Sequence, residues 1–135
     1  MRVLVDTSVW SHALRRKGRH DATIRGELER LITEGRVVML GPIRQELLSG
    51  LKTEQQFERL RQGLAPFPDE QLVRDDYERA ALCFNQCRRK GIQGSNTDFL
   101  LCAVALEREI PIFTMDNDFR LFQKALTIRL HTPRG

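Results

Sequence analysis

The sequence has 135 residues, of which 41% are hydrophobic and 30% are charged, and its formal net charge is +4. This balance is typical of a folded chain with a single core rather than of a disordered or fibrous one, so we expect residues 1–135 to form one domain. The longest apolar run, 99-FLLCAVAL-106, is too short to span a membrane, and the apolar patch at residues 3–5 is too short for a secretory signal, which predicts a cytoplasmic protein with no membrane partner.

The first half of the chain alternates between strand and helix patterns. The unbroken apolar runs at residues 3–5 and 37–40 predict short strands buried on both faces. Between them, residues 21–35 show a helical spacing of apolar residues and end in a glycine. The apolar positions of this predicted helix are Ile24, Leu28, Leu31 and Ile32. The sequence therefore begins with a strand–helix–strand unit.

Two further helices are predicted in the middle of the chain. Pro42 suits the first turn of a helix over residues 42–51, which carries Ile43, Leu47 and Leu51 on one side. Residues 53–64 form a polar helical pattern, and the two prolines of 65-APFPD-69 break it. The segment after this break begins a new element.

A long helix is predicted over residues 70–91. Its apolar stripe consists of Val73, Tyr77, Ala80, Phe84 and Cys87. The sequence has an odd number of cysteines, and no histidine stands at metal-ligand spacing from the pair in this helix. We therefore interpret the cysteines as reduced, buried, small apolar residues rather than as a metal or redox site.

The C-terminal third contains the most apolar helix. The loop at residues 91–97 leads into a helix over residues 97–109 that is apolar on nearly every side, as in the centre of a domain. A buried strand at residues 110–113, a helix at residues 119–126 and an alternating edge strand at residues 127–131 follow. Strands that alternate with helices predict an α/β domain with a mostly parallel sheet.

Acidic residues stand where the predicted strands end. Asp6 directly follows the first strand, and Asp116 comes shortly after the third. Glu46 lies one turn into the helix that follows the second strand, and Asp98 begins the apolar central helix. Because ligands bind outside the carboxyl ends of the strands in an open parallel sheet, we expect these four acids to meet at one edge.

Two of these acids also have structural interpretations as helix-start residues. Asp6 is placed to cap the helix that starts near Ser8. Asp98 favours the dipole of its helix, with Asn96 or Thr97 as the cap. Neither acid identifies a ligand site by itself.

The remaining acids also have structural interpretations. Asp116 and Asp118 suit the turn and cap before the next helix. Glu46 borders an apolar stripe, so we expect it to be half sheltered and to need a partner such as Arg44 or a lysine.

Together the acids indicate a metal site. Several carboxylates a few ångströms apart repel one another, and such a cluster is tolerated when a cation neutralises it. A ligand set of oxygen atoms, without histidine or cysteine, selects Mg²⁺ or Mn²⁺ over Zn²⁺. Hydrated metals of this kind commonly support phosphodiester hydrolysis. The sequence thus predicts a metal-dependent enzyme that acts on phosphodiesters.

The charge outside the predicted metal site favours an anionic partner. Once the acids of the site are set aside, the rest of the chain is more basic than its net charge of +4 indicates. Basic surface gives affinity for a nucleic-acid backbone through phosphate contacts. The alternative is that the basic clusters are solvated helix ends, where cations favour the dipole. The candidates for nucleic-acid contact are Arg15, Arg16, Lys17, Arg44, Arg88, Arg89 and Lys90.

Four segments together resemble the PIN-domain nucleases, and within them the VapC-type toxins of bacterial toxin–antitoxin pairs. They occur in the family order, and the resemblance covers the chain from Met1 to about Leu130. The segments are 4-LVDTSVW-10, 41-GPIRQELLSG-50, 94-GSNTDFLLCAVAL-106 and 110-IPIFTMDNDF-119.

The resemblance implies a PIN-like three-layer α/β/α sandwich around a mostly parallel sheet of four to five strands. It implies endoribonuclease activity that depends on one or two Mg²⁺ or Mn²⁺ ions. It also implies a homodimer, an RNA substrate and a VapB-like antitoxin that blocks the site.

Individual residues match the family pattern by position. The acidic quartet is matched by Asp6, Glu46, Asp98 and Asp116. The resemblance implies that Asp6 and Asp98 hold the principal ion and that the other two acids complete the set of ligands.

Three more residues match positions beside the quartet. Asp118 matches a further acid, which either binds a second metal or orients its neighbour Asp116. Thr7 and Ser8 match hydroxyl positions that can hydrogen-bond an acid or a metal-bound water.

Two alternatives remain beside the toxin hypothesis. The first keeps the fold but is a nucleic-acid-binding or DNA-cleaving protein without a toxin role. The second is a receiver-like signalling module that binds Mg²⁺ at strand ends. Such a module needs adjacent acids after the first strand, whereas Asp6 stands beside Thr7 and Ser8, and no switch lysine follows the third strand.

Overall fold

A computed structural model describes residues 1–14 and 22–135 of the chain. The predicted nucleic-acid contacts at Arg15, Arg16 and Lys17 lie outside these residues. The elements follow one another as β1 (Val3–Val5), α1 (Thr7–Leu14), α2 (Ala22–Thr33), β2 (Val37–Val38), α3 (Gly41–Leu48), α4 (Glu54–Leu64), α5 (Arg74–Arg89), α6 (Asn96–Arg108), β3 (Ile112–Phe113) and α7 (Asp118–Phe122).

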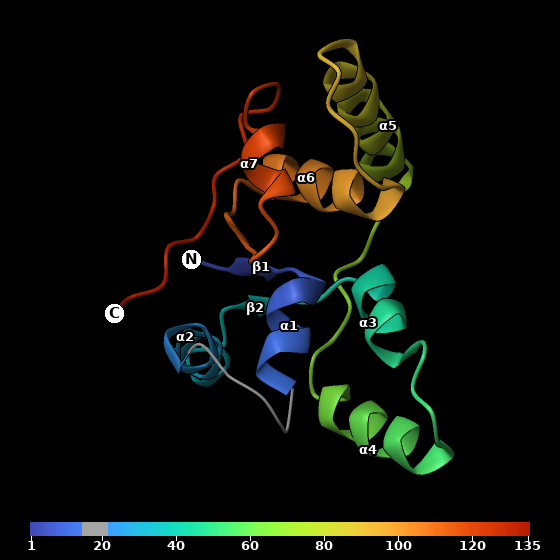
Figure 1. Ribbon diagram of the computed structural model, residues 1–135, viewed down its shortest axis with the longest axis vertical. Helices are drawn as coiled ribbons and strands as arrows, with labels where there is room; N and C mark the ends of the chain where they lie inside the picture. Colours follow the sequence, from blue (N-terminus) through green and yellow to red (C-terminus); the bar gives the residue numbers. More distant parts are fainter. Residues whose placement is uncertain (15–21) are drawn as a thin grey trace.

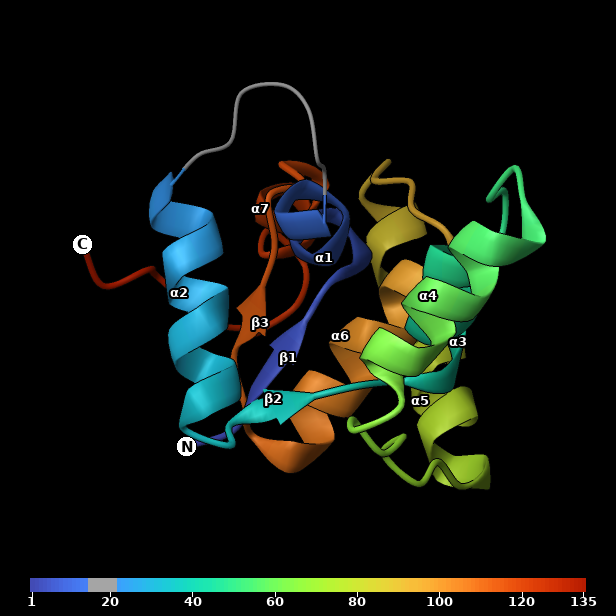
Figure 2. The same cartoon turned by 90° about the horizontal axis from the view of Figure 1, so that it is seen from below.

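The sheet is parallel and has β1 in its centre, in the order β2-β1-β3. Val3 pairs with Val37 on one side, and Val5 pairs with Phe113 on the other. Helices α5, α6 and α7 lie on one side of the sheet, and α1 and α2 lie on the other (Figures 1 and 2). Because both faces are covered, all residues of β1 are fully buried. This arrangement confirms the predicted three-layer α/β/α fold.

The prediction of four to five strands is wrong for the described part of the chain, which forms a sheet of three strands. The predicted edge strand at residues 127–131 contributes only an isolated bridge between Leu130 and Ile112. The neighbouring strand β3 is only two residues long, so residues 127–131 cannot form a longer ladder beside it. A second isolated bridge joins Met39 to Asp69.

Helix α5 begins later and buries a different face than its apolar pattern predicts. Val73 is its N-cap, and Val73 and Tyr77 are 54% and 56% exposed. Asp76 is turned inward instead, because Arg108 on α6 pairs with its carboxylate. Ion pairing thus overrides apolar spacing in the first turn, while Cys87 at the far end of the helix is buried as predicted.

Smaller differences concern the ends of elements. Ile32 and Leu51, which were predicted to lie on buried stripes, are exposed at 38% and 37%. Helix α7 ends at Phe122 rather than continuing to residue 126. All three cysteines are buried free thiols, as predicted, and burial raises the pKa of each. No helix within the described ranges is long and apolar enough to cross a membrane.

The connections place a topological switch point at the carboxyl edge of the sheet. The chain leaves β1 in one direction to reach β2 and returns past β1 to reach β3, so the order reverses beside β1. Such a reversal is where open parallel sheets place their ligands. Asp6 follows β1, and the loop at residues 114–117, called the β3–α7 loop below, follows β3.

Candidate active site

Asp6 lies at the centre of the carboxyl edge and is 7% exposed. Its Oδ2 accepts hydrogen bonds of 2.7 Å from Ser8 Oγ and 2.8 Å from Thr114 Oγ1. The backbone oxygen of Asp6 accepts from the amide of Val9 at 3.1 Å, so the backbone rather than the carboxylate supports the start of α1. The side chain is therefore positioned by hydroxyls from two segments.

The β3–α7 loop is held by hydrogen bonds from its amides to the side chains of Ser8, Thr114 and Asp116. The amide of Met115 donates to Ser8 Oγ at 3.0 Å, and the amide of Asp116 donates to Thr114 Oγ1 at 3.0 Å. Oδ1 of Asp116 in turn accepts from the amide of Asp118 at 2.9 Å. Asp116 thus has the turn role expected from its sequence position, and this role also fixes the direction of its carboxylate.

Asp98 stands in the first turn of α6 and forms a capping box with Ser95. Ser95 Oγ accepts from the amide of Asp98 at 3.0 Å, and Asp98 Oδ2 accepts from the amide of Ser95 at 3.2 Å. The expectation that Asn96 or Thr97 caps this helix is wrong. A serine three residues before an acid, as in 95-SNTD-98, is the signal for this cap.

Glu46 projects from α3 and is exposed to solvent. Desolvation and then the charges of Asp6 and Asp98 raise its pKa, while hydrogen bonding by Thr7 and Thr97 opposes the increase. The carboxylate is therefore within electrostatic range of two other acids.

The pKa of Asp98 is raised in the same way. Burial has the largest effect, hydrogen bonds from Ser95 oppose it, and the charges of Asp6 and Asp116 raise the pKa further. Asp98 thus links all members of a group that we call the acid cluster. The acid cluster consists of Asp6, Glu46, Asp98 and Asp116. The structure brings these residues near enough to repel one another.

The composition of the acid cluster fits a hard divalent cation. Every candidate ligand atom is a carboxylate oxygen. The pKa values of Glu46 and Asp98 are raised first by burial and then by the charges of neighbouring acids, and a cation would neutralise those charges. Within the described ranges, no group of three or more acidic, histidine or cysteine side chains is arranged closely enough to hold an ion. The carboxylates therefore share an electrostatic site at a spacing wider than direct coordination.

Thr7 provides a second observation at this site. Its Oγ1 is buried and meets no complete hydrogen-bond geometry in the part of the chain that is described, although it lies near enough to influence Glu46. Among the described residues the hydroxyl therefore has only an incomplete contact, with Glu46, which leaves it available to a further partner. Its position beside the carboxylates suits a bond to a hydrated ligand.

The predicted basic contacts are not all free to bind a substrate. Arg44 binds Asp69 at 2.9 Å and the carbonyls of Leu64 and Phe67, which ties α3 to the segment after α4. It is therefore not the partner of Glu46 that the sequence suggested. Its contact with RNA stays a prediction.

Arg88, Arg89 and Lys90 stand at the C-terminal end of α5, which Figure 1 shows pointing away from the sheet. The guanidinium of Arg88 lies 5.9 Å from the centre of the Phe84 ring, and Lys90 Nζ donates to the carbonyl of Lys124 at 2.8 Å. Their contact with RNA also stays a prediction.

The sequence reasoning missed two residues that organise the acid cluster. Ser95 orients Asp98, and Thr114 binds Asp6 while receiving the amide of Asp116. The capping-box spacing identifies Ser95. Thr114 has a weaker signal, because a hydroxyl at the end of a strand has many other uses.

Together, the fold and the acid cluster define an α/β protein with an acidic site at the switch point of a parallel sheet. A PIN domain family model matches residues 3–125. The chain therefore belongs to the PIN domain family, as its motifs predict, and this membership points to a nuclease.

Solved structures share the fold over nearly the whole chain. VapBC2 from Rickettsia felis bound to a promoter DNA fragment matches with a TM-score of 0.78 at 17% identity, covering 97% of this chain and 98% of that one. FitAcB from Neisseria gonorrhoeae matches with a TM-score of 0.71 at 21% identity, covering 97% of both chains. VapBC-1 from nontypeable Haemophilus influenzae matches with a TM-score of 0.73 at 12% identity, again over 97% of both chains. No curated protein sequence matches this one.

Proposed function

We propose that the protein is a metal-dependent endoribonuclease and the toxin of a toxin–antitoxin pair. The observation that carries the proposal is the gathering of Asp6, Glu46, Asp98 and Asp116 at the switch point of a PIN-family sheet, where burial and then the charges of neighbouring acids raise the pKa of Glu46 and of Asp98. Acids that repel one another at the position where such sheets bind ligands suit a site completed by a cation.

The acid cluster would hold one or two Mg²⁺ or Mn²⁺ ions. Asp6 and Asp98 would bind the principal ion, with Glu46 and Asp116 completing its ligands. Asp118 would bind a second ion, or its amide would serve only to orient Asp116. When bound, the metal supplies a water of lowered pKa and polarises a phosphoryl oxygen.

The other residues of the site position these acids. Ser8 and Thr114 hold Oδ2 of Asp6 and leave its second oxygen for a ligand. Ser95 fixes Asp98 at the start of α6, where the N-terminal end of the helix dipole favours a negative charge. The Thr7 hydroxyl would bind a hydrated ligand. Donors that are positioned in advance lower the reorganisation needed during phosphodiester cleavage.

The names of the structural neighbours support the proposed partners. VapBC2 and FitAB are toxin–antitoxin assemblies, each solved with a DNA fragment. We propose by analogy that this chain binds a cognate VapB-like antitoxin that covers the acid cluster. We also propose a homodimer, with RNA as the substrate.

A cleavage assay tests the proposal. The wild type should cut RNA with Mg²⁺ or Mn²⁺, and EDTA or Asp6→Asn should abolish cutting. Asp75→Asn is the matched control, because Asp75 is an exposed acid on α5 outside the acid cluster. Cutting that survives EDTA or Asp6→Asn would overturn the mechanism.

A second assay separates the toxin from its alternatives. Single-stranded RNA, structured RNA and single-stranded DNA are compared at the same salt concentration, because phosphate contacts depend on salt. Growth arrest on expression that Asp98→Asn relieves supports the toxin role. Cutting of DNA alone would favour the DNA-cleaving alternative.

A further inference from the structure

A cavity of about 340 Å³ borders the acid cluster, and Asp116 forms part of its wall. The β3–α7 loop and Arg120 line one side, and residues 131–133 line the other. The volume falls in the range of small-ligand sites. Because Asp116 belongs to the acid cluster and also lines the cavity, a ligand in the cavity would lie beside whatever binds at the acid cluster.

The loop side of the cavity is rigid. The amides of Met115, Asp116 and Asp118 all donate to side-chain oxygens of the site. The amide of Arg120 donates to the carbonyl of Asn117 at 3.0 Å, which begins α7. The side chains that line the cavity therefore start from a fixed backbone.

Three of these side chains have groups available for a ligand. Met115 is 40% exposed. Asn117 is the N-cap of α7, yet its side chain forms no cap bond, because the amides of Phe119 and Arg120 donate to the backbone oxygens of Asp116 and Asn117. Arg120 is exposed and forms no ion pair within the described residues. An apolar surface, an amide and a guanidinium thus face one cavity.

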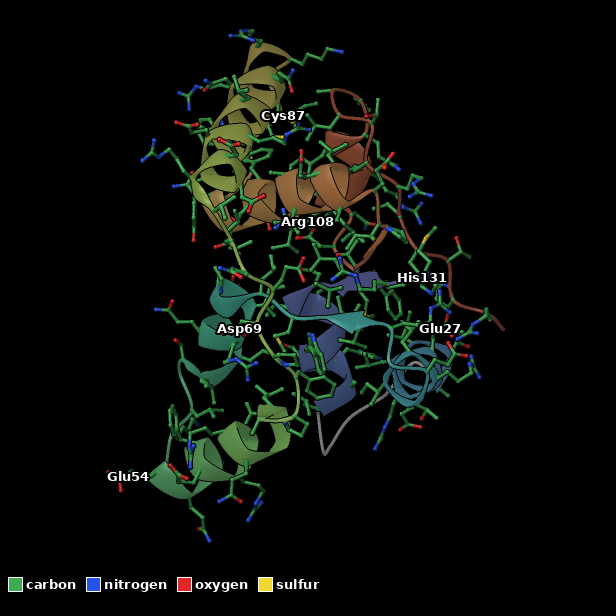
Figure 3. All side chains as sticks on the ribbon, turned by 180° about the vertical axis from the view of Figure 1, so that it is seen from behind. Glu27, Glu54, Asp69, Cys87, Arg108 and His131 are labelled. Carbon is green, nitrogen blue, oxygen red and sulfur yellow. The ribbon has the colours of Figure 1, made fainter. Side chains whose placement is uncertain are left out.

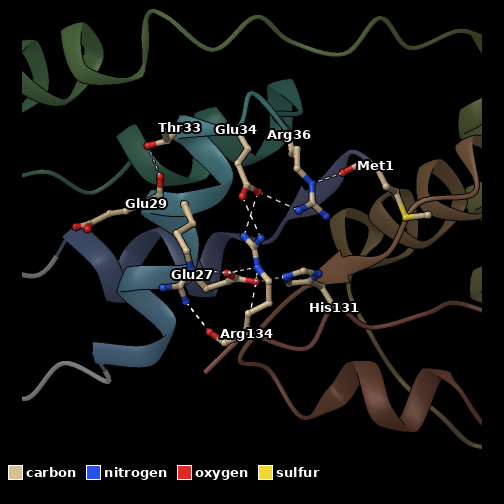
Figure 4. A network of polar contacts seen from close by, with 9 residues as sticks. Met1, Glu27, Glu29, Thr33, Glu34, Arg36, His131 and Arg134 are labelled. Carbon is tan, nitrogen blue, oxygen red and sulfur yellow. Dashed lines mark hydrogen bonds and ion pairs between the residues drawn. The ribbon is translucent and has the colours of Figure 1, made fainter.

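The opposite wall is tethered to α2. Nε2 of the cavity-lining residue His131 donates a hydrogen bond of 2.6 Å to Oε2 of Glu27. Arg134 binds Glu27 at 3.1 Å and Glu34 at 3.0 Å (Figure 4). The C-terminal segment is therefore attached to α2 on both sides of residues 132–133. Figure 3 shows Glu27 and His131 facing each other from α2 and the C-terminal segment. The cavity is therefore a built pocket between two fixed walls.

These groups match the parts of a nucleotide. A guanidinium pairs with a phosphate, an amide can hydrogen-bond to the edge of a base, and a thioether packs on its face. Single-stranded RNA is recognised mainly through unstacked bases and backbone phosphates.

We infer that this pocket binds the nucleotide next to the cleaved phosphodiester, with Arg120 on its phosphate, Met115 on its base and Asn117 reading the base edge. The inference rests on the proposed nuclease function. It adds the residues that choose the cleavage sequence.

Binding in EDTA tests the pocket without cleavage. The probe is a short fluorescent single-stranded RNA, prepared as four homopolymers. Arg120→Ala should weaken binding to all four and reduce the slope of log affinity against log salt by roughly 0.7, the value for one lost phosphate contact. Arg74→Ala is the matched control, an exposed arginine at the start of α5.

Asn117 should decide preference rather than overall affinity. Asn117→Ala should flatten the differences among the four homopolymers, while Asn85→Ala, an exposed asparagine on α5, should leave them unchanged. If Arg120→Ala and Asn117→Ala bind like their controls, or if the wild type binds none of the probes, the inference is overturned.

The cleavage assay separates this inference from the proposed function. If the wild type cuts RNA with Mn²⁺ and Asn117→Ala changes the positions of the cuts, both stand. If cutting is metal-dependent but occurs at the same positions in the wild type and in Asn117→Ala, the assignment of the pocket fails and the proposed nuclease function stands. If the wild type does not cut, the proposed function fails, and the binding measurements in EDTA still decide whether the pocket holds a nucleotide.

Discussion

The hydroxyl of Thr114 joins the ends of β3 and β1, because its Oγ1 donates to Oδ2 of Asp6 at 2.8 Å. The same oxygen accepts from the amide of Asp116 at 3.0 Å. One side chain therefore positions two members of the acid cluster that come from different strands. The spacing between Asp6 and Asp116 depends on a residue that is not itself a candidate ligand.

Thr114→Val tests this dependence, since valine keeps the shape of threonine and removes the hydroxyl. We expect affinity for Mn²⁺ to fall about 10- to 100-fold, as for other residues that orient metal ligands. The free energy of unfolding should fall by about 1–3 kcal/mol, because the amide of Asp116 loses its partner.

Isothermal titration with Mn²⁺ and denaturant unfolding in EDTA measure the two effects of Thr114→Val. Thr114→Ser, which keeps the hydroxyl, should behave nearly as the wild type in both. A valine variant with unchanged metal affinity would show that Thr114 does not organise the site.

Asp98→Asn should separate stability from metal binding. The charges of Asp6 and Asp116 contribute to the raised pKa of Asp98, so a neutral side chain relieves repulsion while its amide oxygen can still accept from Ser95. In EDTA we expect Tm to rise slightly, on the order of 2 °C.

Mn²⁺ should reverse the order of stability, so that the wild type becomes more stable than Asp98→Asn. A metal at 100 times its dissociation constant stabilises the wild type by about 2.7 kcal/mol, whereas the variant should gain little. Calorimetric melting in EDTA and in Mn²⁺ measures the difference in Tm between the two proteins and the stabilisation of each by the metal. Equal gains in the two proteins would remove Asp98 from the ligand set.

Local sequence patterns were enough to predict the layers of the fold and the placement of the acids. The unbroken apolar runs of β1 and β3 require burial on both faces, and the acids that follow them must emerge at the same edge. Asp6 and Asp116 could therefore be placed together without the structure. Their status as metal ligands stays a prediction.

The incorrect predictions arose where a residue distant in the sequence determines the local structure. Arg108 turns Asp76 inward and rotates the buried face of α5, which a helical wheel of α5 alone does not reveal. Glu27 in α2 is likewise fully buried, and two of its partners, His131 and Arg134, come from the far end of the chain. Ion pairs between residues so far apart in the sequence leave no pattern in the sequence around either residue.

Gly94 is expected to tolerate no side chain. A Cβ atom there would lie 2.6 Å from Cζ of Phe122 and 3.0 Å from Cε2 of Phe99, and both rings are buried. Because the added methyl group would force at least one of these buried rings to shift, Gly94→Ala should destabilise the protein by about 1–3 kcal/mol.

Gly63→Ala is the matched control for Gly94→Ala. Gly63 lies in α4 with nothing within 4 Å of the added methyl, so alanine should stabilise the helix by about 0.5–1 kcal/mol. Urea unfolding compares the two. Destabilisation of equal size at both sites would mean that backbone effects, rather than the aromatic contact, decide the result.

The network around Glu27 should give the protein a specific sensitivity to acid. Burial raises the pKa of Glu27, but hydrogen bonds from His131, Arg30 and Arg134 outweigh it and lower the pKa from its usual 4.5 to about 2. A lowered pKa in the folded state means that the unfolded chain binds the proton more readily. The stabilisation is therefore complete above pH 4.5 and is lost as the pH falls toward 2.

Glu27→Gln removes this linkage while keeping the size of the side chain. At neutral pH the variant should be less stable by on the order of 3 kcal/mol, because three donors lose a charged acceptor. The difference from the wild type should narrow as the pH falls from 4.5 to 2, which denaturant unfolding at a series of pH values measures. Glu29→Gln, whose surface pair with Arg25 is exposed, should differ from the wild type by less than about 0.5 kcal/mol throughout. A Glu27→Gln difference that stays constant with pH would mean that the shape of the side chain, rather than its charge, secures the C-terminal segment to α2.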